Sequence, residues 1–243
     1  MIKTGKLYGL GVGPGDPGLI TLKAVEVLRA VDVVFAASSS KNEYSLALRI
    51  VRPYISEGTP VIRLPFPMTH DREDLETAWE ENAREVIIEL RGGRDAAFIT
   101  IGDALTYSTY GYLLREIKRQ SPESIIETVP GITSYQAAAA VANVPLVEGK
   151  ESLLIASGTD TSQKIRMASG ITENMALLKT YRNFDEIFTT VDELGLVDKT
   201  IGVVRCGLPE EEVISDIRDM KGKDAHYLTL LIVKGKGFDK QQL

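Results

Sequence analysis

The stretch LYGLGVGPGDPGLITLKAVEVL, residues 7–28, decides the fold of the N-terminal half. Its opening residues, LYGLGV, are apolar or glycine throughout, which is typical of a strand buried on both faces of a parallel sheet. From residue 20 onward, apolar residues recur with the spacing of one helix face. A buried strand, a glycine-rich loop and a helix in this order predict a βα unit of a doubly wound sheet.

The loop itself contains G-x-G-x-x-G within residues 13–18, which is the spacing of a dinucleotide-binding loop. A phosphate cradle works through backbone N–H groups, and Pro14 and Pro17 have none to donate. The next strand, DVVFAASSS, carries Asp32 at its beginning and lacks the acid expected at its end for a ribose. Both features disfavour a nicotinamide-dependent oxidoreductase, which stays an alternative.

Composition narrows the class of protein. The 243 residues are 44% hydrophobic and 26% charged, with a formal net charge of −6, as in an ordinary globular protein. The acidic balance argues against nucleic-acid binding, and no apolar run approaches the roughly 20 residues of a membrane span. Cys206 is the single cysteine, which predicts a reducing, cytoplasmic compartment. His70 and His226 are far apart in the sequence, so we expect no metal site.

Short apolar runs alternate with helical patterns along the chain. The first half predicts strands at 7–13, 32–37, 60–66, 95–102 and 124–131, joined by four crossovers. The clearest helical pattern spans 71–91, with Gly92 as its expected C-terminal cap. The second half predicts strands at 152–157, 175–180, 200–206 and 226–233, with helical spacers around 160–168, 183–194 and 210–221. We therefore expect two α/β domains, residues 1–131 with an open parallel sheet and residues 132–243 with a mixed sheet.

Three strand ends of the first domain carry unusual sequence. They are the Gly/Pro loop, the segment GDALTYSTYGYLL that begins at Gly102, and the segment VPGITS that begins at Val129. In open α/β sheets, ligands collect at the carboxyl ends of the strands, and parallel topology brings these loops to one edge. Each loop taken singly has a plainer interpretation as a connector rich in turn residues.

Together, LYGLGVGPGDPGLITLKAVEVL, GDALTYSTY and VPGITSYQAAAA resemble the tetrapyrrole methylase family in order and spacing. The resemblance extends from Leu7 to about Val233. It implies two α/β domains with S-adenosylmethionine in the cleft between them, in a homodimer that methylates a small-molecule tetrapyrrole. Within the family, GDALTYSTYGYLL is most similar to the enzymes that methylate C-20 of precorrin-2 or cobalt-factor II. One departure is Ala104, where the common pattern has proline, which affects the stiffness of that loop.

The resemblance also implies which residues contact the cofactor, position by position. These are Pro14, Ile101, Gly102, Asp103, Thr106, Thr133, Ser134, Thr180 and Gly207. A sulfonium ligand has no phosphates to cradle, so glycines for close approach and prolines for rigidity suit the first loop.

The methyl group of the cofactor is already electrophilic, so the protein chiefly has to align the reacting atoms and exclude water. Asp103 and Tyr107 are the candidate catalytic residues for removing the proton, with His70 a further candidate. The plainer interpretations are a loop-capping aspartate and a packed tyrosine. The substrate is a polycarboxylate, and Arg49, Arg52 and Arg63 are candidates for a local basic patch.

Several functions stay open beside C-20 methylation. Within the same fold they are uroporphyrinogen-III methylation, another corrin-ring methylation, and diphthamide methylation on a protein. From other classes come the nicotinamide oxidoreductase and a non-catalytic regulator that has kept the ligand site.

Overall fold

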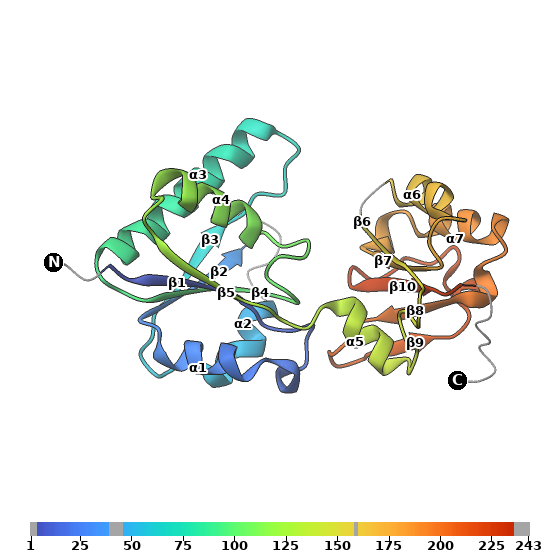
Figure 1. Ribbon diagram of the computed structural model, residues 1–243, viewed down its shortest axis with the longest axis horizontal. Coiled ribbons are helices and arrows are strands. Elements are labelled where there is room, and N and C mark those ends of the chain that lie inside the picture. Colours follow the sequence, from blue (N-terminus) through green and yellow to red (C-terminus); the bar gives the residue numbers. More distant parts are fainter. Residues whose placement is uncertain (1–3, 39–45, 158–159, 236–243) are drawn as a thin grey trace. The chain divides into compact units, whose positions relative to one another are not determined.

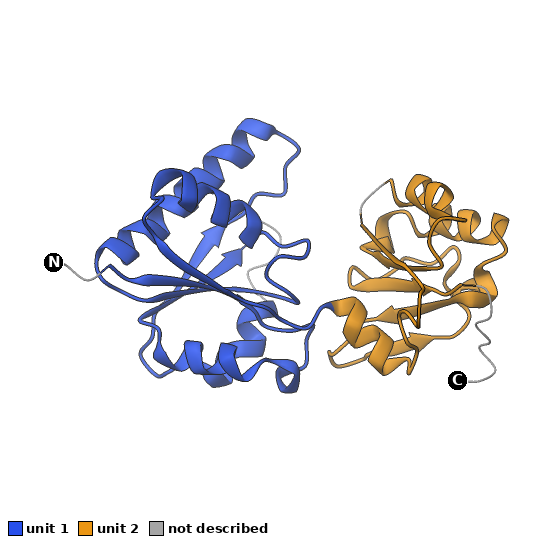
Figure 2. Ribbon diagram, in the orientation of Figure 1, with its two compact units in different colours: residues 1–133 blue, residues 134–243 orange. Residues whose placement is uncertain are grey.

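Two open sheets of five strands each organise the chain (Figure 1). The computed structural model describes residues 4–38, 46–157 and 160–235. The chain divides into two compact units, residues 1–133 and 134–243 (Figure 2). Among the described residues, no helix combines the length and the apolar character that crossing a membrane requires.

The sheet of unit 1 is parallel throughout, with strand order β3-β2-β4-β1-β5. Its strands are β1 (Lys6–Gly11), β2 (Val33–Ser38), β3 (Val61–Pro65), β4 (Ala96–Thr100) and β5 (Ile125–Val129). Each lies within a predicted strand or within one residue of it. The central strand β4 is buried along its whole length, which explains why its sequence shows no polar alternation.

Helices cover both faces of this sheet (Figure 1). The helices α1 (Leu22–Ala30) and α2 (Leu46–Val51) cover one face, and α3 (Arg72–Arg91) and α4 (Tyr110–Gln120) cover the other. The α1 face is filled by residues such as Leu28, Val34 and Ile99, and the α3 face by residues such as Phe35, Phe98 and Leu113. Neighbouring strands β1 and β4 are therefore followed by helices on opposite faces, which makes their carboxyl ends the switch point of the sheet, where ligands of open α/β sheets bind.

Tyr110, the first residue of α4, is fully buried and reaches across β1. A Cβ atom on Gly9 of β1 would lie 2.0 Å from Cζ of the Tyr110 ring, so only glycine fits beneath it. The Tyr110 hydroxyl lies 3.0 Å from Oγ1 of Thr128 in β5. Burial raises the pKa of Tyr110, consistent with a neutral phenol packed in the core. The start of α4 is thus anchored to the sheet.

The C-terminus of α3 shows how glycine ends a helix. Gly92 is the C-cap, as predicted, and has a helical φ of −70°. The left-handed residue is the following glycine, Gly93, with φ of 81°. The N–H of Gly93 donates to the Leu90 carbonyl at 3.0 Å, and the N–H of Arg94 donates to the Glu89 carbonyl at 3.2 Å. These two bonds satisfy the last carbonyls of the helix in a Schellman arrangement.

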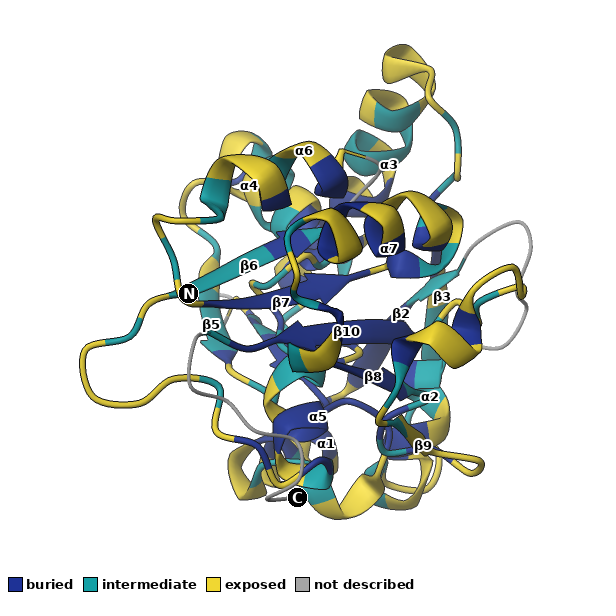
Figure 3. Cartoon of the chain, turned by 90° about the vertical axis from the view of Figure 1, so that its right-hand side faces the viewer, coloured by how far each residue is buried: buried dark blue, intermediate teal, exposed yellow. Residues whose placement is uncertain are grey.

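The sheet of unit 2 is mixed, with strand order β6-β7-β10-β8-β9. Its strands are β6 (Leu153–Ser157), β7 (Asn174–Leu178), β8 (Thr200–Val204), β9 (Glu212–Ile214) and β10 (Thr229–Val233). β6 and β7 are parallel, and β10 runs antiparallel to both β7 and β8. The helices of this unit are α5 (Ser134–Val141), α6 (Thr161–Ala168) and α7 (Phe184–Glu193). Figure 3 shows β7, β10 and β8 buried between them. The predicted fold class, an open parallel sheet followed by a mixed sheet, is confirmed.

The prediction of a helical spacer at 210–221 is wrong. That segment forms the short strand β9 and one turn of 3-10 helix, Ile217–Met220. Pro209 followed by three glutamates has the composition of a helix start, which misled the sequence interpretation. The segment pairs with β8 as a strand instead of forming a helix, because Gly202 of β8 leaves room for Ile214 opposite it.

Candidate functional site

Three glycines from separate strands meet at the carboxyl edge of the unit 1 sheet. A Cβ atom on Gly131 would lie 2.2 Å from the carbonyl oxygen of Gly102, and one on Gly11 would lie 2.6 Å from the nitrogen of Gly131. Such distances exclude any side chain at either position. Gly102 and Gly13 also exchange two backbone hydrogen bonds, of 2.7 and 3.1 Å. The three loops predicted to share one edge are therefore in direct contact.

The Gly/Pro loop makes a poor phosphate cradle, because several of its N–H groups are already used. The N–H of Gly13 donates to Gly102, the N–H of Val12 donates to the Thr100 carbonyl, and the N–H of Gly18 donates to Oδ1 of Asp16. Pro14, which is buried, has no N–H to offer. This arrangement supports the sequence argument against a pyrophosphate ligand.

Asp103 links two of the loops through its carboxylate. Oδ1 accepts from the N–H of Leu105 at 2.9 Å and from the hydroxyl of Thr106 at 2.9 Å. Oδ2 accepts from the N–H of Gly131 at 3.1 Å. We call the loop after β4 (residues 101–109) the β4 loop and the loop after β5 (residues 130–133) the β5 loop. With these three donors, the Asp103 carboxylate links the two loops, in line with the plainer interpretation of a loop-capping aspartate.

The β4 loop presents exposed apolar side chains on a fixed frame. Ile101, Leu105 and Tyr107 are 37%, 61% and 53% exposed, although each is large and hydrophobic. Tyr107 has a φ of 52°, in the left-handed region that non-glycine residues rarely adopt, and such strain clusters at ligand sites. The hydroxyls of Thr100 and Ser108 lie 2.9 Å apart and close the base of the loop.

Gly102 is buried, but it has free space beside its α-carbon. Its φ is 71°, and a Cβ atom built there would meet nothing within 4 Å. The α-carbon is therefore uncrowded on that side, whereas the carbonyl oxygen accepts from the N–H of Gly13 and lies against Gly131. Open backbone beside exposed apolar side chains fits a ligand with an apolar body and several hydrogen-bonding groups, such as S-adenosylmethionine.

Two further predicted cofactor contacts, Thr133 and Ser134, lie just after Gly131 in the sequence. Thr133 is buried and ends unit 1, and Ser134 is the first residue of α5. Both follow Gly131, which the structure brings against Gly11 and Gly102. Six of the predicted residues thus lie in or directly after the loops that converge, namely Pro14, Ile101, Gly102, Asp103, Thr106 and Thr133.

Thr180 and Gly207 lie in unit 2, after β7 and β8. The Thr180 hydroxyl is buried and donates to the carbonyl of Thr229 at 3.2 Å. Gly207 has a φ of 74°, and its N–H donates to Oε2 of Glu211 at 2.6 Å. Both residues shape the turns at the ends of their strands.

The sequence interpretation missed a cluster of cationic and aromatic residues at the same strand ends of unit 2. These residues, called here the strand-end cluster, are Lys179, Tyr181, Arg182, Arg205 and Tyr227. Each lies within a few residues of a predicted strand end, in LLKTYR, VVRCG and HYLT, and this pattern of cations and aromatics could have identified them.

The remaining candidate cations and His70 lie at the surface of unit 1. Arg63 lies in the edge strand β3, and Arg49 and Arg52 lie on α2 and in the turn after it, all three exposed. His70 is exposed in the loop after β3. Burial, together with the neighbouring Glu211, raises the pKa of Cys206 to about 12, so this thiol stays protonated and is a poor nucleophile. Among the described residues, no group of three histidine, cysteine or acidic side chains is placed to hold a metal ion.

Comparisons with known proteins agree with this geometry. A cobalt-precorrin-2 C(20)-methyltransferase of Salmonella typhimurium is 38% identical over 86% of this chain and 86% of its own length. A probable cobalt-precorrin-2 C(20)-methyltransferase of Methanocaldococcus jannaschii is 37% identical over 94% of this chain and 96% of its own. The fold is similar to uroporphyrin-III C-methyltransferase of Thermus thermophilus complexed with S-adenosyl homocysteine, with a TM-score of 0.68 and 21% identity, covering 95% of this chain and 92% of that one.

The chain matches the tetrapyrrole (corrin/porphyrin) methylases over residues 6–220. This match covers the sheet of unit 1 with its converging loops and, in unit 2, the strands β6 to β9. The resemblance carried by the three quoted motifs is confirmed, and this protein belongs to the tetrapyrrole methylase family.

Proposed function

We propose that this protein transfers the methyl group of S-adenosylmethionine to C-20 of precorrin-2 or of its cobalt form, cobalt-factor II, in cobalamin biosynthesis. One observation carries the proposal: relatives named for C-20 methylation align with nearly the whole chain, including the segment GDALTYSTYGYLL. Within that segment, Leu105 and Tyr107 are the large hydrophobic side chains exposed on the loop after β4. Methylation of uroporphyrinogen-III is the principal alternative within the same fold.

We propose that the cofactor is bound by the positions that the family motifs indicate. In unit 1 these are Pro14, Ile101, Gly102, Asp103, Thr106 and Thr133, and in unit 2 they are Ser134, Thr180 and Gly207. The support is the open backbone at Gly102 and the crowding of Gly11 and Gly131, which together leave one accessible side on the β4 turn. When bound, the cofactor supplies an electrophilic methyl group on a sulfonium.

The residues of the chain then have to position and shield the reactants, because the chemistry needs little activation. Asp103 holds the β4 and β5 loops at a fixed separation through its three hydrogen bonds. Leu105 and Tyr107 present apolar surface that would exclude water from reactants bound on the β4 loop. Asp103 is thus proposed as a positioning residue, and Tyr107 stays the predicted catalytic candidate for contact with the substrate.

The test is a set of incubations with S-adenosylmethionine and each candidate tetrapyrrole. The methylated carbon is assigned by mass spectrometry and NMR. We expect a single added methyl at C-20 of precorrin-2 or cobalt-factor II. Methylation of uroporphyrinogen-III alone would contradict the regiochemistry and leave the cofactor assignment intact.

We further propose that the protein acts as a homodimer in the cytoplasm. The homodimer rests on the family resemblance, and the compartment rests on the single, buried Cys206. Light scattering at micromolar concentration should give about twice the monomer mass of 26.6 kDa. A mass that stays at the monomer value at all concentrations would contradict the dimer.

A further inference from the structure

The carboxyl ends of β7 and β8 form a second convergence of strand ends, within unit 2. Both strands pair antiparallel with β10, so they run parallel to each other and end at the same edge. Leu178 at the end of β7 and Val203 near the end of β8 both lie opposite Leu230. Residues that directly follow β7 and β8, and residues that precede β10, therefore share one edge.

Backbone hydrogen bonds fix this edge. The N–H of Arg205 donates to the Leu228 carbonyl at 3.0 Å, and the Thr180 hydroxyl donates to the Thr229 carbonyl. Lys179 and Arg205 each directly follow a strand and have left-handed φ values of 56° and 55°. Non-glycine residues in this region cost about 1–2 kcal/mol each, and two cations strained alike at neighbouring strand ends indicate a functional constraint.

The aromatic members of the strand-end cluster contact one another. The rings of Tyr181 and Tyr227 meet edge to face, with centroids 5.0 Å apart. Arg182 lies over the Tyr181 ring at 5.5 Å and donates from Nε to the Tyr181 hydroxyl at 2.7 Å. Burial raises the pKa of Tyr227, with smaller effects from the nearby Tyr181 and Arg182. Two phenols and a guanidinium are thus held together, while Tyr227 stays 53% exposed.

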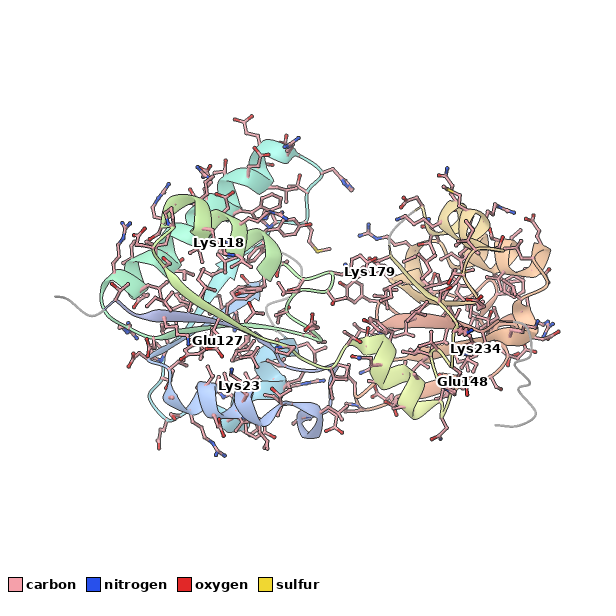
Figure 4. All side chains as sticks on the ribbon, viewed as in Figure 1. Lys23, Lys118, Glu127, Glu148, Lys179 and Lys234 are labelled. Atoms are coloured by element: carbon pink, nitrogen blue, oxygen red, sulfur yellow. The ribbon has the colours of Figure 1, made fainter. Side chains whose placement is uncertain are left out.

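Among the residues that the structure describes, Arg205 is the one cation of the strand-end cluster with an ion-pair partner. Arg205 pairs with Glu210, whose own side chain is 71% exposed. Lys179 (labelled in Figure 4) and Arg182 are exposed, and neither forms an ion pair with any carboxylate among the described residues. The protein as a whole is acidic, with a net charge of −6, so two unpaired cations beside two tyrosines form a local anion-attracting surface.

We infer that the strand-end cluster binds carboxylate side chains of the tetrapyrrole substrate, with Arg182 and Lys179 as the charged contacts. The inference rests on the proposed function, because the substrate class supplies the carboxylates. With Nε bonded to Tyr181, the guanidinium of Arg182 keeps its two terminal nitrogens for a carboxylate. Tyr181 and Tyr227 offer aromatic edges and hydroxyls to the macrocycle around the carboxylate arm. These residues replace Arg49, Arg52 and Arg63 as the basic patch expected from the sequence.

The inference is tested by fluorescence titration with porphyrins of different carboxylate number. An octacarboxylate porphyrin and a tetracarboxylate porphyrin serve as stable probes, and inorganic pyrophosphate serves as a competitor. Arg182→Met and Lys179→Met remove the proposed charged contacts with the carboxylate. Arg182→Lys keeps the positive charge but loses the two terminal guanidinium nitrogens that bind a carboxylate side by side. Arg166→Met is the matched control, because Arg166 is paired with Glu193 near the C-termini of α6 and α7, toward the opposite edge of the sheet.

We expect Arg182→Met to weaken binding of the octacarboxylate probe at least about tenfold, and Arg182→Lys to recover part of the loss. The wild-type preference for the octacarboxylate over the tetracarboxylate should shrink in the variant and with added salt. Unchanged affinity in Arg182→Met, an equal loss in Arg166→Met, or full competition by pyrophosphate would overturn the inference. If Arg182→Met did not fold, the salt dependence of the wild-type preference and the result for Lys179→Met would decide it.

The same preparations separate this inference from the proposed function. Calorimetry with S-adenosylmethionine and the methylation assay report on the proposed function and are not expected to depend on probe carboxylates. If the wild-type enzyme methylates its substrate and Arg182→Met binds the porphyrin probes as well as wild type, only the proposed role of the strand-end cluster is refuted. Absent methylation with intact, Arg182-dependent porphyrin binding refutes the reaction and leaves the anion site.

Discussion

Replacing Gly102 by valine tests the candidate site most directly. The residue has a φ of 71°, so any L-residue there is strained by about 1–2 kcal/mol. No atom lies within 4 Å of the added Cβ, so the substitution creates no clash within the described protein. The branched side chain would instead occupy the open side of the β4 turn. We expect the affinity for S-adenosylmethionine to fall at least about tenfold, or roughly 1.4 kcal/mol, while the fold is retained.

The matched control is Gly58→Val in the same unit. Gly58 has a φ of 83° and also meets nothing within 4 Å, but it lies in the turn before β3, at the amino ends of the strands. Both substitutions therefore introduce left-handed backbone strain, but only Gly102→Val does so at the candidate site. Gly92→Val is not a suitable control, because the φ of Gly92 is −70° and its substitution introduces no left-handed strain.

Calorimetry gives the affinity of each variant, and circular dichroism with a thermal scan gives its folded fraction and apparent Tm. Both variants should lose a similar amount of stability, and only Gly102→Val should lose affinity. Normal cofactor binding by folded Gly102→Val would place the site elsewhere. Equal loss of binding in Gly58→Val would show that strain, rather than obstruction of the turn, caused the effect.

Two further substitutions test the frame of the site, and a third tests the ion pairs of the sheet that carries it. In Gly131→Ala the new Cβ would lie 2.2 Å from the Gly102 carbonyl oxygen, so we expect a loss of about 3 kcal/mol of stability, seen as a lower Tm; an unchanged Tm would contradict the crowding. Asp103→Asn places an amide donor against the N–H of Gly131, at a cost of about 1–3 kcal/mol of stability. The substitution should therefore raise KM for the cofactor. A turnover slowed by about a hundredfold or more with unchanged KM would instead identify Asp103 as a catalytic base. Hydrogen bonds from two lysines lower the pKa of Glu127 from 4.5 to about 2, so its ion pairs stabilise the folded state above pH 4.5 and this stabilisation is lost as the pH falls toward 2. The Tm difference between wild type and Glu127→Gln should therefore narrow over that range, and a constant difference would refute the assignment.

The ion pairs of Glu127 lie on the surface of the sheet and not at the candidate site. Glu127 of β5 bonds to Lys6 of β1 and to Lys23 of α1, and Figure 4 labels Lys23 and Glu127. Its effect on stability is thus independent of ligand binding, which makes Glu127→Gln a clean reporter of folding.

Local patterns in the sequence predict most of the fold. The helix expected at 71–91 forms as Arg72–Arg91, because Asp71 caps it by accepting from the N–H groups of Glu73 and Asp74. All these signals lie within a few residues of one another. The strand β9 does not follow from such signals, since its three residues are stabilised by pairing with β8, which lies about ten residues earlier.

The contacts of the candidate site depend on strand order, which local sequence does not encode. Gly11 meets Gly131 because β1 and β5 are neighbours, although about 120 residues separate them in the chain. Parallel topology predicts that the three loops share one edge, but it does not tell which of them are in contact. The strand-end cluster was missed for the same reason, because only the antiparallel β10 brings Tyr227 toward Tyr181.

The anchoring of Tyr110 has a consequence for engineering this enzyme. The β4 loop is tied at its start by the Gly102–Gly13 pair and at its end by Tyr110, which bonds to β5 across Gly9. The exposed side chain of Leu105 takes no part in either tie and can be exchanged while the frame keeps its shape, and Tyr107 lies on the same loop. At position 107 the left-handed backbone favours asparagine or glycine as replacements and disfavours valine or isoleucine. A small library at these two positions is therefore a practical route to redirecting the methyl group to another carbon of the macrocycle.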